Sequence, residues 1–165
     1  MPSLVPETMD ARSPGKSASE GSAQMLIERR EWSMASDVSA IAPMVETVQA
    51  LCVNAGFSQR QCRFNIPIAI TEALSNAMLR GNENDRSRQV HLVIAFESHR
   101  LVVEVTDEGN GFDLAGLKQS PDDPDWFERE DGRGMFLMRS LMDVVECCTP
   151  GAQRGHTLRL ILNRP

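Results

Sequence analysis

The sequence predicts an α+β fold: a two-layer sandwich in which helices cover one face of a mixed, mostly antiparallel sheet. Segments of helical periodicity and segments of strand alternation follow one another in an order that includes antiparallel hairpins. The 165 residues are enough for one domain, and apolar residues make up 41% of them, which allows a sizeable core. No internal repeat is visible in the chain.

The first 24 residues are expected to form a flexible tail, so the domain is expected to span residues 25–165. The tail is rich in Ser, Pro, Gly and Ala and lacks the apolar centre of a secretory signal. No apolar run reaches the ~20 residues that cross a bilayer, so we expect a cytoplasmic protein without a membrane partner. The formal net charge of −6 argues against direct, sequence-independent binding to nucleic acid, which depends on Lys and Arg.

After the tail, Met25–Met34 shows weak alternation and is expected to be a strand. Ser36 or Ser39 is expected to cap a helix that Gly56 ends, and Pro43 is expected to disturb its first turns. The predicted buried stripe of this helix consists of Val38, Ile41, Val45, Val48 and Cys52.

A second helix is predicted over Gln59–Leu79, with an irregular start at Pro67 and a polar break after it. Two strands, Val90–Glu97 and Leu101–Thr106, are close enough in sequence to form a hairpin through the short link between them.

Residues 107–133 have no sustained period and contain many Gly, Asp and Pro residues, which is typical of a functional or disordered loop. A third helix is predicted over Gly134–Met142. Two more strands are predicted, Val144–Cys148 and Thr157–Leu162.

The four cysteines form no CxxC metal pair. Cys147 and Cys148 are adjacent in a predicted strand, so their side chains are expected on opposite faces. We interpret all four as reduced thiols in or near the core.

Glu72 and Asn76 are four residues apart on the second predicted helix and therefore share a face. An amide oxygen is a hard donor that can ligate Mg²⁺, and a neighbouring carboxylate can orient or deprotonate a hydroxyl group. The same pair is also typical of an ordinary solvated helix face.

Two glycine-containing motifs follow. The segment Asp107-Glu-Gly-Asn-Gly111 comes directly after a strand, where glycines allow close approach to a ligand and Asp107 can accept a hydrogen bond from an amino group. The segment Asp131-Gly-Arg-Gly134 opens the third predicted helix, where free N–H groups and the helix dipole favour an anion. Alone, the first also fits a simple turn, and the second a glycine-rich helix entry.

The order of these motifs resembles the GHKL superfamily of ATPases and kinases, and most closely its branch of anti-sigma-factor serine/threonine kinases. The stretch Ile70–Ala77 with Gly81-Asn82 resembles the asparagine box of that branch, and Val105–Phe112 resembles its first glycine box. Gly132–Asp143 resembles its second glycine box, and the resemblance covers about Met25–Leu162.

The resemblance implies a Bergerat ATP-binding fold with ATP and Mg²⁺ as cofactors. It implies that Glu72 is the catalytic residue, as general base or polarising carboxylate, and that Asn76 holds Mg²⁺ through its amide oxygen. It further implies that Asp107 binds the adenine amino group with support from Thr157. Gly109 and Gly111 would shape the adenine pocket.

Gly132, Arg133 and Gly134 would bind the phosphates, and the segment between Gly111 and Gly132 would be a lid over ATP. The sequence departs from the branch at Arg80, where a His is common, and this departure leaves the kinase activity in doubt.

The function that the resemblance implies is phosphorylation of an anti-sigma antagonist protein, which frees or sequesters a sigma factor by partner switching. A homodimer is the expectation for this branch. The alternatives are a nucleotide-dependent protein-binding switch without kinase activity, the ATP domain of a histidine kinase, and a non-enzymatic module. The histidine kinase reading lacks a helical segment with a suitable His.

Overall fold

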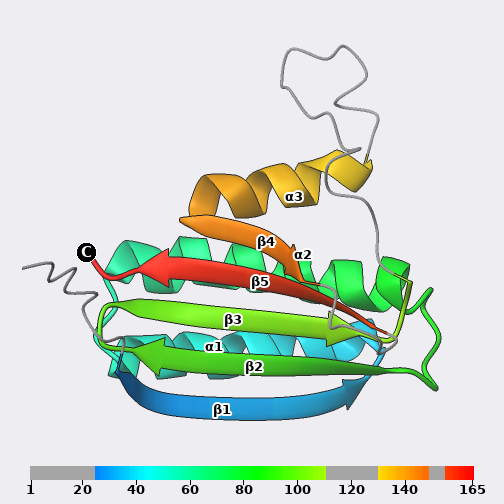
Figure 1. Cartoon of the computed structure of the whole chain (residues 1–165), viewed down its shortest axis with the longest axis horizontal. Coiled ribbons are helices and arrows are strands. Elements are labelled where there is room, and N and C mark those ends of the chain that lie inside the picture. The colour runs from blue at the N-terminus through cyan, green and yellow to red at the C-terminus, as the bar shows by residue number, and fades with distance from the viewer. Residues whose placement is uncertain (1–24, 111–129, 149–154) are drawn as a thin grey trace, which may run out of the picture.

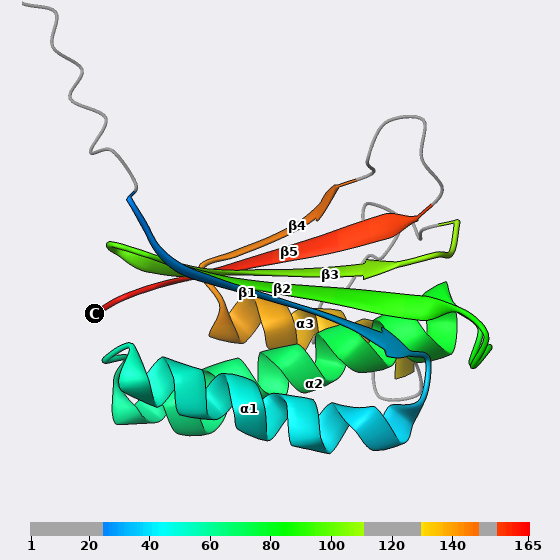
Figure 2. The ribbon, with the colours of Figure 1, turned by 90° about the horizontal axis from the view of Figure 1, so that it is seen from below.

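The computed structural model describes residues 25–110, 130–148 and 155–165. Five strands form one sheet in the order β1-β2-β3-β5-β4, and the helices α1, α2 and α3 all lie on one side of it (Figures 1 and 2). The predicted two-layer α+β fold is therefore confirmed. Every strand pairing in the described residues is antiparallel, so this part of the sheet has no parallel pair.

The five strands lie within two residues of the predicted bounds. They are β1 (Leu26–Ala35), β2 (Gln89–Glu97), β3 (Arg100–Asp107), β4 (Val144–Cys148) and β5 (His156–Asn163). Alternate residues of β2 and β3 point toward the helices and are buried, as the alternation predicted. The link between these two strands is Ser98-His99, one residue shorter than expected.

The first helix begins differently from the prediction. A short 3₁₀ turn, η1 (Val38–Ala40), leads into α1 (Ile41–Asn54), and the cap is Asp37, whose Oδ1 accepts a 3.0 Å hydrogen bond from the Ser39 N–H. Neither predicted serine is the cap, because the carboxylate between them reaches the free N–H. Pro43 falls in the first turn, where a missing N–H costs little, and the helix continues through it.

Most of the predicted stripe of this helix is confirmed: Ile41, Val48 and Cys52 are buried. Val38, by contrast, is 48% exposed, because it lies in the 3₁₀ turn before the helix. Gly56 follows the end of α1 with φ +80°, the left-handed conformation that makes glycine a common helix terminator.

The second helical segment runs in three parts: a π-helical turn η2 (Gln61–Asn65), α2 (Ile66–Asn76) and a second π-helical turn η3 (Ala77–Gly81). The irregular start at Pro67 is confirmed, since the π-helical turn ends just before the first residues of α2. π-Helical turns are often found at functional sites, and η3 ends next to the motifs described below.

The third helix, α3 (Glu130–Leu141), begins four residues before the predicted start at Gly134. The prediction stopped at the glycines, because glycine lowers helix propensity by about 1 kcal/mol. The structure places Gly132 and Gly134 inside the first turns, where both are buried. At Gly134, α3 packs closely on α2, since an added Cβ atom would lie 2.4 Å from Glu72 Oε2.

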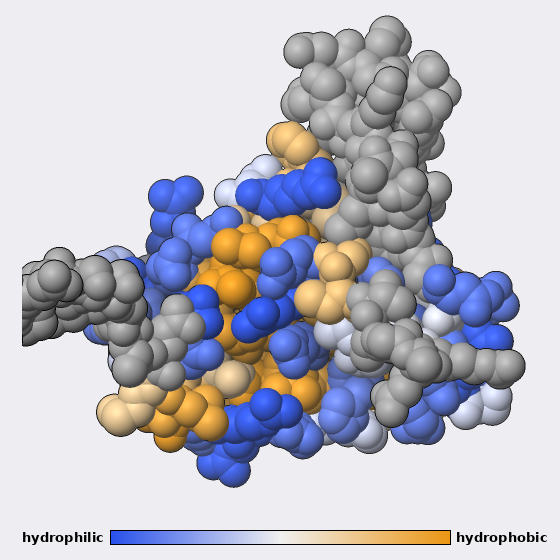
Figure 3. All heavy atoms as spheres, viewed as in Figure 1, coloured by the Kyte–Doolittle hydropathy of each residue, from blue (hydrophilic) through white to orange (hydrophobic). Residues whose placement is uncertain are grey.

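The core lies between the sheet and the helices, and Phe96, Ile70, Leu74 and Met138 are among its fully buried side chains. No helix in the described ranges has the length and apolarity needed to span a membrane. The other face of the sheet carries a small cluster of Ala95, Val102 and Ile161. Figure 3 shows apolar surface in the middle of this face, surrounded by hydrophilic residues.

The cysteine predictions are confirmed in part. Cys52 and Cys62 are buried and reduced, and Cys147 and Cys148 point to opposite faces of β4. Cys147 packs against the core, whereas Cys148 is exposed, because it pairs with a residue on the open face of the sheet.

Candidate functional site

The carboxylate and amide on α2 face the start of α3. A Cβ atom added to Gly134 would lie 2.4 Å from Glu72 Oε2 and 3.7 Å from Asn76 Nδ2. Both side chains are half-buried, and they share one face of α2 as their spacing predicted. The structure therefore brings together three residues from two of the predicted motifs, and only a glycine fits at position 134 without displacing Glu72.

The start of α3 offers backbone donors at the same place. The first four N–H groups of a helix have no partner within it, and here they include those of Gly132 and Arg133. The Arg133 side chain is exposed. Together with the positive end of the helix dipole, these groups suit an anion held between α3 and α2.

Asp107 ends β3 and is only 4% exposed. The Gly109 N–H donates a 2.8 Å hydrogen bond to its Oδ1. Burial raises the pKa of Asp107, and the Gly109 hydrogen bond and the charges of His156 and Arg88 oppose this rise. The carboxyl group is thus a buried hydrogen-bond acceptor, and the Gly109 N–H in the turn after β3 holds it in one orientation.

Glycines surround this carboxyl group. A Cβ atom added to Gly81 would lie 2.2 Å from Asp107 Oδ2, and one added to Gly109 would lie 2.1 Å from the Gly81 carbonyl oxygen. The end of η3 and the turn after β3 therefore meet at Asp107 with no space for larger side chains. Gly109 is a confirmed neighbour of Asp107, whereas Gly111 and the predicted lid lie outside the described residues.

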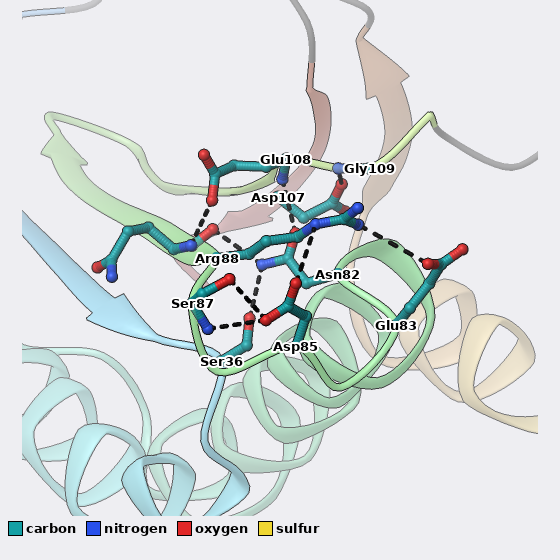
Figure 4. Close-up of polar contacts among 10 residues, drawn as sticks. Ser36, Asn82, Glu83, Asp85, Ser87, Arg88, Asp107, Glu108 and Gly109 are labelled. Atoms are coloured by element: carbon teal, nitrogen blue, oxygen red, sulfur yellow. Dashed lines mark hydrogen bonds and ion pairs between the residues drawn. The ribbon is translucent and has the colours of Figure 1, made fainter.

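A second hydrogen-bond network, centred on Asn82, holds the turn after Asp107 in place (Figure 4). The fully buried Asn82 donates from Nδ2 to Ser36 Oγ at 2.6 Å and to the Gln89 carbonyl oxygen at 2.9 Å. Its Oδ1 accepts a 2.8 Å hydrogen bond from the Glu108 N–H. Asn82 thereby joins Ser36, which follows β1, to the first residue of β2 and to the residue after Asp107.

The resemblance implied that Thr157 supports Asp107, but the structure places the two side chains on opposite faces of the sheet. The strand register pairs Asp107 with His156 and Thr106 with Thr157. Paired residues share a face and successive residues alternate, so Thr157 lies on the open face, with its Oγ1 2.8 Å from Thr106 Oγ1. His156 lies beside Asp107 instead, with its Nδ1 4.0 Å from Asp107 Oδ2.

Sequence reasoning missed His156 and the role of Asn82. The alternation of Leu158, Leu160 and Leu162 puts His156 on the core-facing side of β5, so the sequence contained a signal for His156. Asn82 had no comparable signal, because two of its three partners, Ser36 and Glu108, come from distant parts of the chain. Arg80, where the family commonly has His, is exposed on η3.

Comparisons with known proteins identify the family and several similar sequences. Residues 34–162 match the family model of the histidine kinase-like ATPase domain. The chain is 28% identical over 105 residues to a serine-protein kinase RsbW of Oceanobacillus iheyensis, covering 61% of this chain and 66% of that protein.

Two further relatives have names of the same kind, an anti-sigma factor and a serine-protein kinase. The chain is 30% identical over 97 residues to an anti-sigma F factor of Anoxybacillus flavithermus, covering 58% of this chain and 66% of the relative. It is 34% identical over 86 residues to the serine-protein kinase RsbW of Bacillus subtilis, covering 49% and 54%. Each match spans just under two thirds or less of the relative's length.

The family model covers most of the chain and includes all three motifs. The chain therefore belongs to the histidine kinase-like ATPase domain family.

Proposed function

We propose that the chain binds ATP with Mg²⁺ and transfers the terminal phosphoryl group to a serine or threonine of an anti-sigma antagonist protein. The observation that carries this proposal is the meeting of Glu72, Asn76 and Gly134 between α2 and α3. Membership of the ATPase family and similarity to proteins named as serine-protein kinases and an anti-sigma factor support it.

At the base end, Asp107 accepts a hydrogen bond from the amino group of adenine. Its buried carboxyl group suits this role, because Gly109 fixes Oδ1 and the surrounding glycines leave backbone close to the ligand. A buried acceptor without its partner would cost free energy, which favours ligands that supply an amino group.

At the phosphate end, the N–H groups of Gly132 and Arg133 and the cradle at Gly134 hold the phosphate oxygens. Asn76 supplies a hard oxygen donor for Mg²⁺, which binds with few protein ligands when phosphates are present. Bound Mg²⁺ would neutralise charge that develops on the phosphates.

Glu72 positions the acceptor hydroxyl group and removes its proton. The hydroxyl oxygen forms a bond to the γ-phosphorus as the bond to the bridging oxygen breaks, and ADP leaves. Glu72 is half-buried beside Asn76, so its carboxylate is close to the phosphate end of the site. The products are ADP and a phosphorylated antagonist.

In this account the unphosphorylated antagonist binds the chain, and the phosphorylated antagonist releases it to hold a sigma factor. We further propose a homodimer as the working form, which is the expectation for this branch. The names of the relatives support the partner class.

A second candidate is a nucleotide-dependent binding switch without kinase activity. The exposed Arg80 favours it, because this residue stands where kinases of the branch commonly have His, one turn after Asn76. Both candidates need the same pocket and differ only in the chemical step.

The test is a transfer assay with the full chain, γ-labelled ATP and candidate antagonist proteins, with Glu72→Gln as the matched control. The proposal expects label on a serine or threonine of the antagonist, and loss of that label with Glu72→Gln. A chain that binds ATP and the antagonist but transfers no label would establish the switch instead.

A further inference from the structure

His156 lies at the point where β5 comes closest to the end of β3. Gly155, the residue before it, has φ +128°, and a Cβ atom added there would lie 2.7 Å from the Asp107 carbonyl oxygen. The left-handed conformation and the close approach together require glycine at this position. The backbone therefore fixes His156 directly opposite Asp107 in the strand register.

The two side chains form one buried unit on the helical side of the sheet. Each residue is 4% exposed. Asp107 Oδ1 already accepts from the Gly109 N–H, and Asp107 Oδ2 is 4.0 Å from His156 Nδ1. A neutral imidazole carries one N–H donor, and the protonated ring carries two. The pair thus presents a hydrogen-bond acceptor and a donor side by side.

Two other ionisable groups interact with Asp107. Burial raises the pKa of Asp107, and the charge of Arg88, in the polar segment that precedes β2, opposes this rise. On β4, burial raises the pKa of the Cys147 thiol to about 11, so this thiol is uncharged at neutral pH. Neither group takes the place of the His156 imidazole beside Asp107. Arg88 belongs to a half-exposed ion-pair cluster with Glu83 and Asp85.

We propose that Asp107 and His156 together read the edge of the purine, with Asp107 accepting from the exocyclic amino group and His156 donating to the adjacent ring nitrogen, N1. The donation is direct or through one water. This makes His156 a specificity-determining residue, and it rests on the proposed ATP site.

The chemistry of the bases explains the selectivity. Adenine presents an amino donor next to the N1 acceptor, which complements an acceptor beside a donor. Hypoxanthine and guanine present the reverse order, a carbonyl acceptor next to an N1–H donor. A site built to hydrogen-bond a ligand rejects analogues strongly, because its own buried polar groups are left without partners.

The experiment is calorimetric titration of the full chain with Mg-ATP and with Mg-1-deaza-ATP, in which a C–H group replaces N1. For the wild type, the proposal expects about tenfold weaker binding of the deaza analogue, the size of one buried hydrogen bond. In His156→Leu, ATP should bind about as weakly as the analogue does, so the ratio of the two affinities should approach one.

Two variants complete the design. Thr157→Val is the matched control, since its hydroxyl group faces Thr106 on the open face, and it should keep the wild-type ratio. His156→Gln retains an N–H donor and should keep part of the ratio, which also covers the case that His156→Leu does not fold.

If the wild type and the folded His156 variants show the same ratio of ATP affinity to 1-deaza-ATP affinity, the role of His156 is overturned. The proposed ATP site would be left intact by that result. Absence of ATP binding to the wild type would overturn the proposed function as well as this inference. The two failures are therefore distinguishable in one set of titrations.

Discussion

The side-chain oxygen of Asn82 accepts a 2.8 Å hydrogen bond from the backbone N–H of Glu108, the residue that follows Asp107. Asn82 comes directly after the π-helical turn η3, so this bond ties the end of the helix that carries Asn76 to the end of β3. The same amide holds Ser36 and Gln89. One buried side chain therefore sets the relative position of the two ends of the candidate site.

The first prediction concerns this amide. Asn82→Ala leaves the buried Ser36 hydroxyl and the Glu108 N–H without their partner, and each such loss costs about 1–3 kcal/mol. We expect a free energy of unfolding lower by about 3 kcal/mol in urea titrations. Ser87→Ala is the control, because it removes only an exposed contact with Asp85. A loss no larger than that of the control would contradict the assigned role of Asn82.

The second prediction is a gain of stability in Asp107→Asn. Burial raises the pKa of Asp107 in the folded protein, so its charged form destabilises the fold. This loss of folding stability depends on pH. It is absent below the unfolded-state pKa near 3.9, grows as the pH rises to the folded-state pKa, and stays constant at higher pH. Asn keeps the acceptor for the Gly109 N–H.

Asp107→Asn should therefore have a higher Tm than the wild type at pH 7, with the difference shrinking toward pH 4. Thermal unfolding at the two pH values measures it. A variant that is less stable at pH 7 would show that the ionised carboxylate stabilises the fold.

The third prediction distinguishes recognition of the adenine base from binding of the phosphates. Asp107→Asn should weaken ATP binding at least about tenfold while leaving inorganic triphosphate nearly unchanged, because the carboxyl group lies at the base end of the site. Competition titrations with both ligands measure this. Equal weakening of the two ligands would point away from adenine recognition.

The fourth prediction concerns the metal. Asn76→Ala removes the side-chain amide that faces Gly134, and with it the proposed oxygen ligand, so the difference between ATP affinity in Mg²⁺ and in EDTA should largely disappear. The fold should survive, because the side chain is half-buried and Asn76 does not belong to the hydrophobic core cluster of the described residues. An Asn76→Ala protein with full Mg²⁺ dependence would require another ligand.

The fifth prediction concerns Glu72. Glu72→Gln should bind Mg-ATP with an affinity within about threefold of the wild type, yet lose phosphoryl transfer by about 10²-fold or more, as expected for a general base. Single-turnover assays separate binding from transfer. Retained transfer in this variant would assign the carboxylate a structural role beside Gly134.

Much of the fold could be predicted from the sequence, because alternation in β2 and β3 and the helical stripe of α2 each report a buried face. The start of α3 could not, since the glycines there argue against a helix, whereas in the structure Gly134 lies against Glu72 of α2. The contact joins residues about 60 positions apart, which no local pattern reveals.

The candidate site was predicted in part for a similar reason. Glu72 and Asn76 share a face because of their spacing alone, and Asp107 ends a strand because alternation stops there. The choice between Thr157 and His156 depends on the strand register, where a shift of one residue exchanges the two faces of the sheet. The core leucines of β5 contain that information, whereas the motif by itself does not.

Calorimetric titration of the purified full chain with ATP, first with Mg²⁺ and then with EDTA, tests the central claim most directly. The account predicts saturable binding of one ATP per chain with Mg²⁺ and markedly weaker binding with EDTA. A folded protein that binds ATP in neither buffer would contradict the account.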